Sequence, residues 1–313
     1  MSVARTKLVK RASLLREAST SPDLISKAPS EARWNEHARL VKAALCISAF
    51  TALEDFVQAR IREVVSKLHG YAPGSRALSN VMKSALVNGA FEALIVRIKD
   101  PARFGIVDAR TYLVMQAEKI ASFGRAGLDP SDLTLSTNGS NVSWKVLEDA
   151  LLAFSVENPA SVVSGVARRL EGGIFVAKDH FENILKWRHQ VAHVADCDVP
   201  LVDVRDYVDK LTLFCASFDI VLSTAVAQVL ASTLAVAPAV TRNADIKLRF
   251  VELHAGQWRN RLETSARGVS RDPDKGVTIL SSEAQARTRG ECVVVRRDGQ
   301  TSATESWSTP FVV

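Results

Sequence analysis

One short run of the sequence combines residue types that could carry out acid–base and phosphate chemistry. Residues 186–196 read KWRHQVAHVAD, which places His189 directly after Arg188 and His193 five residues after it. An imidazole exchanges protons near neutral pH. A guanidinium is always charged and holds carboxylate or phosphate groups in a fixed geometry. The run could therefore bind an anion and move a proton.

The Arg-x4–6-His spacing occurs at two other places and does not identify a site by itself. Arg62 precedes His69, and Arg249 precedes His254. About one or two such matches are expected by chance. Arg62 is followed by Glu63 late in an expected helix, where alternating charges are typical of a solvated face. Arg249 and His254 would face opposite sides of a strand. Both of these pairs are therefore interpreted as structural.

Arg188 differs from the other two arginines because it lies on or beside the apolar stripe of its helix. It follows Phe181 and Ile184 and precedes Val191 at helical spacing. A guanidinium in such a place needs a carboxylate or a phosphate as its partner. His193 is about 140° further around an ideal helix, so the two residues do not share a face. They could flank the edge of one cleft that a second copy of the chain completes.

A metal site is another interpretation of the same helix. His189, His193 and Cys197 have i, i+4, i+8 spacing, which could present three ligands on one helix face. However, Pro200 and the CDVP loop indicate that the helix ends near residue 195, so Cys197 would leave that face. No other cluster of metal-ligating residues is evident in the sequence, and we expect neither a metal nor another cofactor.

Two long amphipathic helices are expected to position this run. In the first, apolar residues at spacings of three and four mark one face. That face consists of Leu40, Ala44, Ile47, Phe50, Leu53, Val57, Ile61 and Val64. Glu54 falls within or beside it, and an acid there needs a partner. The second helix follows the motif, with Asp203 as its expected N-cap. Its apolar face consists of Val204, Tyr207, Leu211, Phe214, Phe218 and Val221.

The chain divides into three parts by composition and periodicity. Residues 1–34 form a basic N-terminal helix and link, 35–240 a helical domain, and 241–313 a small α/β, β-rich domain. In the last part IKLRFVEL, GVTIL and ECVVVRR are typical of strands, SSEAQART of a short helix, and Asp298-Gly299 of a hairpin turn. This part holds twelve Lys or Arg and nine acids. With its tryptophans it could contact RNA, a partner protein or a second subunit.

The bulk properties favour a cytoplasmic protein and exclude several enzyme classes. The net charge of +6 permits a polyanionic partner. Four cysteines without C-x-x-C spacing suit a reducing compartment, and the first twenty residues lack a signal-peptide core. Residues 220–240 could span a bilayer by length, but their polar content favours a buried helix and no membrane association. No GxxxxGK[ST], GxSxG or HExxH motif occurs, so the common NTPase, α/β-hydrolase and zinc-protease classes lack their motifs.

The order of these elements resembles the HEPN superfamily (higher eukaryotes and prokaryotes nucleotide-binding). The run from Arg188 to His193, followed by a Pro/Asp-bearing loop and a long amphipathic helix, is similar to its Arg-x4–6-His motif. The earlier helix FTALEDFVQARIREVV resembles the long first helix of the RiboL-PSP branch, which often carries an acid where Glu54 stands. The segment STNGSNVSWKVLEDAL resembles the middle region of that branch. The resemblance covers about residues 35–235.

This resemblance implies a helical bundle that acts as a metal-independent ribonuclease, commonly in toxin–antitoxin or phage-defence systems. His193 would take the proton of a ribose 2′-hydroxyl or donate one to the 5′-oxygen. Arg188 would stabilise the extra negative charge at phosphorus, and the RNA product would end in a 2′,3′-cyclic phosphate. His189 would orient the substrate or Arg188, and Glu54 would support the site. A homodimer would bring two motifs across a shared cleft, and an antitoxin or defence partner is implied.

Two positions depart from the family pattern, and one alternative stays open. Val194 stands where the family often has Gly, which bears on loop geometry. Ala195 stands where some HEPN toxins carry a Tyr that a partner nucleotidyltransferase modifies, so regulation by that route is not expected. The alternative is a non-catalytic HEPN module that binds a partner protein or nucleic acid. Arg188 would then pair with Glu54 inside the bundle, and His193 would be an ordinary surface histidine.

Overall fold

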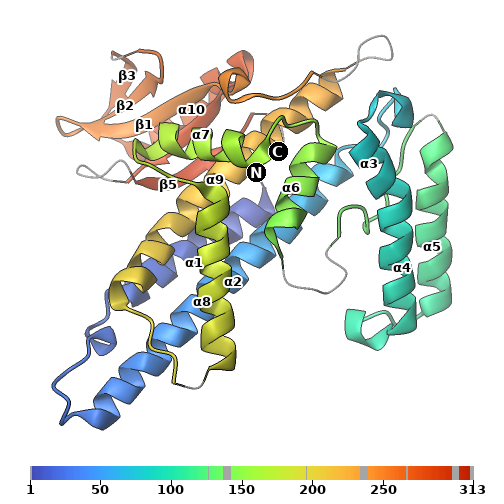
Figure 1. Ribbon diagram of the computed structural model, residues 1–313. Coiled ribbons are helices and arrows are strands. Elements are labelled where there is room, and N and C mark those ends of the chain that lie inside the picture. The colour runs from blue at the N-terminus through green and yellow to red at the C-terminus, as the bar shows by residue number, and fades with distance from the viewer. Residues whose placement is uncertain are drawn as a thin grey trace.

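The computed structural model is mainly helical, with one small sheet at one end of a helical bundle (Figure 1). It describes residues 2–125, 127–136, 142–194, 196–232, 239–265, 267–297 and 303–310. The helices are α1 (Val3–Ser19), α2 (Ala32–Ser66), α3 (Asn80–Ser84), α4 (Ala90–Lys99), α5 (Ala109–Ala121), α6 (Trp144–Ala153), α7 (Pro159–Glu171), α8 (Ala177–His193), α9 (Leu201–Ala231) and α10 (Lys275–Arg289). The strands are β1 (Leu248–His254), β2 (Gln257–Leu262), β3 (Gly268–Asp272), β4 (Cys292–Arg296) and β5 (Thr304–Ser308). The expected fold class is confirmed.

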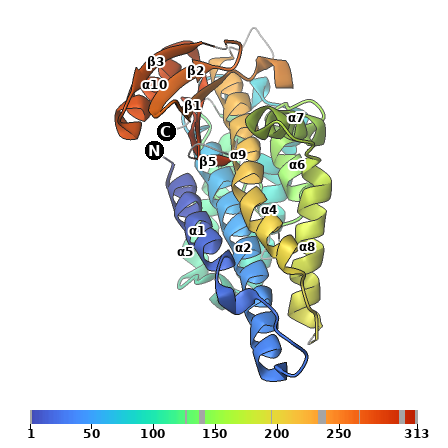
Figure 2. The ribbon, with the colours of Figure 1, turned by 90° about the vertical axis from the view of Figure 1, so that its left-hand side faces the viewer.

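The core of the bundle is the long helix α9. All six residues of its expected apolar face are buried, and every residue from Leu211 to Val226 is buried. α1 and α2 pack along it, and α8 packs against α2 (Figures 1 and 2). α9 is long and apolar enough to cross a membrane, but 83% of its most apolar window is buried inside the protein. A helix surrounded by protein on all sides is apolar all round, so α9 is a core helix, as expected for the described residues up to 231.

The long helix α2 follows the expected apolar face over its second half only. From Phe50 onward the expected residues are buried, but Leu40, Ala44 and Ile47 are exposed. The first half instead buries another face, made of Ala38, Lys42, Leu45, Cys46 and Ala49. Apolar residues occur on both sides of this half, and its beginning projects beyond the other helices (Figure 1). Spacing alone therefore could not determine which side the neighbouring helices cover.

The helix ends around the motif differ in detail from the expectation. α9 begins at Leu201 with Pro200 as its N-cap, so the expected Asp203 cap is wrong. Asp203 lies in the first turn, where a negative charge is favourable next to the helix N-terminus. Ser143 is the N-cap of α6, but its side chain makes no capping hydrogen bond. α8 ends at His193, two residues before the expected end.

A helical hairpin stands to one side of the bundle. α3 continues through a π-helical turn (Ala85–Gly89) into α4, and α5 packs against α4 (Figure 1). α4, α5 and the segment after α5 share a small apolar core of their own: Ala90, Ala93, Leu94, Ile120 and Leu133. The segment after α5 returns to the bundle and forms no helix over residues 127–136, where Gly, Asp, Pro and Ser favour turns.

The C-terminal sheet has the strand order β3-β2-β1-β4-β5. β1 and β4 are parallel, and the other neighbours are antiparallel. α10 covers one face, while Phe250, Val294 and Trp307 on the other face join the core of the helices. The strands expected in IKLRFVEL and ECVVVRR are confirmed. The strand expected in GVTIL is wrong, because Asp274 caps the amide of Val277 and starts α10 there.

Two further differences concern the sheet edges. β2 and β3 were not expected, because their sequences QWRNRL and GVSRD lack the apolar alternation that indicates a strand. β4 and β5 pair as antiparallel neighbours, while the expected Asp298-Gly299 turn between them lies outside the described residues.

A buried carboxylate connects the sheet with the helices through hydrogen bonds. Asp219 of α9 accepts hydrogen bonds from Arg5 at 2.7 Å, from Arg60 at 2.5 Å and from the Trp307 indole at 2.7 Å. Burial alone would raise the pKa of Asp219, but the charges and hydrogen bonds of the two arginines and the indole hold it below its ordinary value. The beginning of α1, the last two turns of α2 and strand β5 therefore meet at the carboxylate of Asp219.

Candidate functional site

The Arg–His run occupies the last two turns of α8, at the end of the bundle away from the sheet (Figure 1). The first half of α8 is anchored by Ala177, Phe181 and Ile184, which are buried. Three to four residues per turn place Arg188 near this anchored face and leave His189 and His193 on another. The bundle therefore fixes the helix, and its last turns carry the polar side chains.

The two histidines of the run lie side by side on the surface. The ring centroids of His189 and His193 are 4.5 Å apart, with the rings tilted by 57°. Both residues are exposed. The i, i+4 spacing thus brings the two imidazoles together as the sequence predicted. A ligand in the solvent can therefore reach either ring.

Arg188 faces α2 instead. It is half-buried, and its guanidinium carbon lies 5.9 Å from the ring centroid of Phe50. A cation over an aromatic ring at this distance is held by the electrons of the ring face. Arg188 and His193 therefore occupy different faces of α8, in agreement with their 140° offset on an ideal helix.

Glu54 lies one turn after Phe50 on α2 and is half-buried. Its Oε1 accepts a hydrogen bond of 2.8 Å from the amide of Val142, just before α6. Burial raises the pKa of Glu54, and the Val142 hydrogen bond and the positive charge of Arg188 only partly oppose this. Glu54 and Arg188 are thus close enough to interact electrostatically. Glu54, the acid expected beside the apolar face of α2, therefore interacts electrostatically with Arg188 of the motif.

Two ion pairs hold the loop that follows the motif against α2. Arg39 pairs with Asp196 at 2.9 Å, and the buried ammonium of Lys42 pairs with Asp198. The loop leaves His193 directly, so these pairs determine the path of the chain next to the imidazole. Neither pair was predicted, because the partners lie far apart in the chain, at separations of 157 and 156 residues. Phe50 and the Val142 amide were missed for the same reason.

The alternative metal site of His189, His193 and Cys197 lacks one of its three ligands in the structure. α8 ends at His193, so Cys197 lies beyond the helix and leaves the face of the histidines. Among the described residues, no group of three or more His, Cys, Asp or Glu side chains is placed to hold a metal ion.

The other two Arg–His matches lie in different surroundings. Arg249 is buried in β1 and pairs with Glu291 at 2.6 Å, while His254 is exposed at the end of the strand. The Arg249–His254 match is therefore structural, as expected. His69 lies just after α2 and forms a 2.9 Å contact with Asp129 through Nδ1. Arg62 is exposed one turn before the end of α2 and lines the same cavity as His69.

The end of α8 can thus present a fixed cation and two solvent-accessible imidazoles. A guanidinium held by Phe50 and by the charge of Glu54 is already oriented before an anion arrives. An exposed imidazole can take or donate a proton near neutral pH. In one chain the arginine and His193 point to different sides, so an anion that contacts both must lie at the edge of the helix or be shared with a second copy.

The comparisons with known proteins agree with the resemblance of the sequence. A family model described as RiboL-PSP-HEPN matches residues 10–224. The matched span runs from α1 to the second half of α9 and includes α8 with its Arg–His run. It ends before the C-terminal sheet begins. No curated protein and no solved structure matches the chain significantly.

Proposed function

The chain belongs to the RiboL-PSP-HEPN family, and we propose that it is a metal-independent endoribonuclease whose site is the end of α8. One observation carries this proposal. Within the matched span, the exposed His189–His193 pair stands beside an arginine that packs against α2. HEPN domains are often ribonucleases, and these residue types suit cleavage of RNA by its own 2′-hydroxyl.

In the proposed reaction the protein supplies proton transfer and charge stabilisation. His193 takes the proton of the 2′-hydroxyl while the 2′-oxygen forms a bond to phosphorus. The bond from phosphorus to the 5′-oxygen breaks, and that oxygen takes a proton from an acid such as the same motif of a second copy. The products are a 2′,3′-cyclic phosphate and a 5′-hydroxyl. Arg188 stabilises the charge on the phosphoryl oxygens, with His189 and Glu54 in supporting roles.

A homodimer would complete this site. Arg188 and His193 lie on different faces of α8, and two copies facing one another would place the arginine of one chain near the histidine of the other. A mixture of Arg188→Ala and His193→Ala chains should then recover part of the cleavage that each variant lacks alone. Failure of the mixture to recover activity, with mixed dimers present, would limit the site to one chain.

The biological setting that fits such an enzyme is a toxin or a phage-defence effector, held in check by an antitoxin or another defence partner. An unpartnered, constantly active ribonuclease in the cytoplasm would degrade the RNA of its own cell. The basic character of the chain, with a net charge of +6, suits an RNA substrate.

The second candidate is a non-catalytic HEPN module that binds a partner protein or nucleic acid. The electrostatic interaction of Arg188 with Glu54 supports it, because the arginine then has a role inside the bundle. A chemical test separates the two functions. In EDTA, an enzyme should cleave an RNA oligonucleotide and leave cyclic-phosphate ends, and a single 2′-deoxy substitution at the cleaved position should abolish that cleavage. Tight binding without any cleavage would favour the module.

A further inference from the structure

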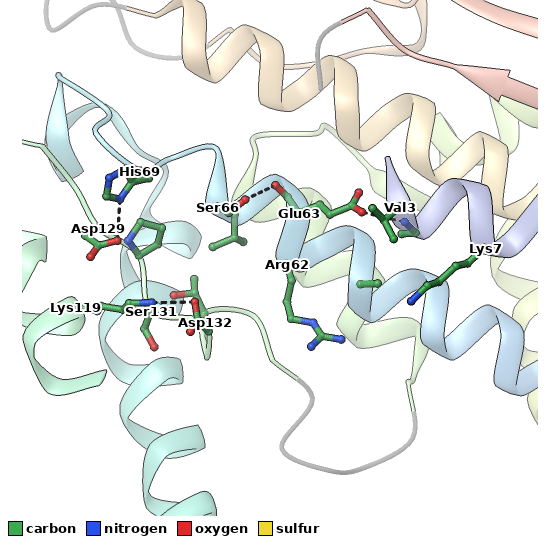
Figure 3. A pocket seen from close by; sticks show the side chains of 15 residues that line it. Val3, Lys7, Arg62, Glu63, Ser66, His69, Lys119, Asp129, Ser131 and Asp132 are labelled. Atoms are coloured by element: carbon green, nitrogen blue, oxygen red, sulfur yellow. Dashed lines mark hydrogen bonds and ion pairs between the residues drawn. The ribbon is translucent and has the colours of Figure 1, made fainter. Parts of the chain in front are cut away.

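A cavity of about 840 Å³ lies between the start of α1, the end of α2 and the segment after α5 (Figure 3). Small-molecule sites commonly enclose about 300–1,000 Å³. The cavity lies outside the Arg–His run, and it contains Arg62 and His69, a second match to the same spacing. It joins the bundle to the helical hairpin, because α5 contributes Lys119 to its wall.

One wall of this cavity carries two cations whose charges are not used by the fold. Lys7 of α1 and Arg62 of α2 both line it and are exposed (Figure 3). In the described ranges Lys7 has no carboxylate partner, and Arg62 donates only to the carbonyl of Gln58. The nearby acid Glu63 does not neutralise them, because Ser2, the Ala4 amide and Arg60 already donate to its carboxylate. Two like charges on one wall favour an anion between them.

The opposite wall is polar and contains a buried group without a partner. Thr134 is 1% exposed and lines the cavity, and its hydroxyl has no hydrogen-bond partner in the described part of the chain. Buried hydroxyls are normally satisfied, so a ligand group facing Thr134 would remove a cost to the fold. Beside it, Asp129 holds His69 and Asp132 holds Lys119 (Figure 3). This wall offers donors and acceptors in a fixed arrangement.

The cavity and the motif are connected along α2. Arg188 faces Phe50 of α2. Glu54, Gln58 and Arg62 follow Phe50 at steps of four residues, so Arg62 lies about 18 Å from Phe50 at 1.5 Å per residue. The polar wall belongs to the segment that later reaches Val142, whose amide binds Glu54. A stacked nucleic-acid strand advances about 3.4 Å per nucleotide. A strand that runs from Arg188 along this row would therefore reach Arg62 after about five nucleotides.

Resting on the proposed ribonuclease activity, we propose that the cavity binds one nucleotide of the substrate RNA at this distance from the cleaved bond. A phosphate lies between Lys7 and Arg62, and the base lies against the wall of Ser131 and Thr134. The base that fits this wall influences where the RNA is cut. A free nucleotide has the same chemistry, so the test below includes both forms.

The test measures binding of a fluorescent 2′-O-methyl RNA octamer, which has no 2′-hydroxyl to react, to the full chain at several salt concentrations. Lys7→Ala/Arg62→Ala should weaken binding about tenfold or more. It should also reduce the slope of log K against log salt by about 0.7, the contribution of the one single-strand phosphate that the two cations hold. The matched control is Lys10→Ala/Arg110→Ala, which removes the same charge from exposed positions outside the cavity. The control should leave the slope nearly unchanged.

A second variant tests the polar wall, and competition separates the two forms of the ligand. Thr134→Val keeps the shape and should weaken binding about fivefold, with a change in base preference across the four homo-oligomers. AMP, CMP, GMP and UMP are added as competitors beside inorganic phosphate. Displacement of the octamer by a mononucleotide, but not by phosphate, identifies free nucleotides as ligands too. No displacement by any of them means that the cavity takes its nucleotide only as part of a strand.

The outcomes distinguish this proposal from the proposed enzyme. Equal binding and equal salt slopes for the cavity variants and the control would overturn the cavity site, even if the wild type cleaves RNA. Cavity-dependent binding by a protein that never cleaves would overturn the ribonuclease and leave the RNA-binding site standing. Lys7 and Arg62 are exposed, so circular dichroism should show unchanged folding in these variants.

Discussion

Charged side chains occur in two contrasting settings at opposite ends of the bundle (Figures 1 and 2). Next to the sheet, Asp219 is completely buried and accepts hydrogen bonds from Arg5, Arg60 and Trp307. At the end of α8, His189 and His193 are exposed and contact each other. A buried charge depends on its partners, and the removal of any one of them is strongly destabilising. An exposed imidazole can be removed at little cost in stability, so its role must be sought in what it binds.

The contrast predicts the largest loss of stability at Asp219. Asp219→Asn leaves the buried guanidinium of Arg5 without a countercharge and Arg60 with Glu63 alone, and it should destabilise the fold by about 3–5 kcal/mol. Asp209→Asn is the matched control on the same helix, because the Asp209 carboxylate is 57% exposed and its ion pair should contribute about 1 kcal/mol or less. Urea unfolding measures both. Similar small losses in the two variants would contradict the structural role of the buried centre.

The stabilisation by Asp219 also has a defined pH dependence. Its folded pKa is lowered below the ordinary value of 3.8. The contribution is therefore fully present above that value and is lost as the pH falls towards the folded pKa.

A second prediction compares histidines on one helix. His180 of α8 is mostly buried between the rings of Phe175 and Phe214, and burial lowers its pKa from 6.5 to about 4. Because the unfolded chain binds the proton more readily, stability falls as the pH drops from 6.5 towards 4. At pH 5 this loss amounts to about 2 kcal/mol at most.

His180→Phe should remove this part of the pH dependence, whereas the exposed control His189→Ala should keep it. Urea unfolding at pH 8 and pH 5 measures the difference for each chain. An equal loss of stability at pH 5 in His180→Phe and the wild type would show that another group titrates.

A third, smaller effect concerns the loop after the motif. Lys42→Met keeps the buried side-chain volume and removes the ion pair with Asp198, so the stability should fall by about 1 kcal/mol or less. If this pair positions His193, cleavage should fall about tenfold, since small misplacements of a reacting group are costly. Lys145→Met, which breaks the exposed pair with Asp149, is the control. Unchanged cleavage in Lys42→Met would mean that the loop does not position the imidazole.

Periodicity predicted most of the bundle but not the details that depend on distant neighbours. The face of α9 was read correctly for two reasons. In its first third, charged residues mark the exposed side, and from Leu211 to Val226 every residue is buried, so no choice of side was required. The first half of α2 was read wrongly at Leu40 and Ile47, because apolar residues stand on both of its sides. The strand expected at GVTIL is a helix, since a run of five apolar or small residues has no period of its own and the Asp274 cap decided it.

In the candidate site too, local features were predicted and contacts between distant segments were not. The Arg188–His193 spacing and the need of Glu54 for a partner were visible in the sequence, because they depend on local residue types. The packing of Arg188 on Phe50 and the pairing of Lys42 with Asp198 depend on segments far apart in the chain. The cavity at Arg62 was also missed, since its cations come from α1 and α2 and its polar wall from a third segment. The alternating charges of Arg62 and Glu63 in the sequence had led to a structural interpretation of the Arg62–His69 pair.

The most direct test of the account is RNA cleavage in the presence of EDTA by the wild type and by His193→Ala. Total tRNA and an mRNA serve as substrates, and circular dichroism confirms the fold of both proteins. The account predicts cleavage by the wild type with cyclic-phosphate ends, and a loss of at least about a hundredfold in the variant. Equal cleavage by both proteins would contradict the assignment of the site. An absence of cleavage by both, from well-folded dimers, would leave the non-catalytic module as the function of this chain.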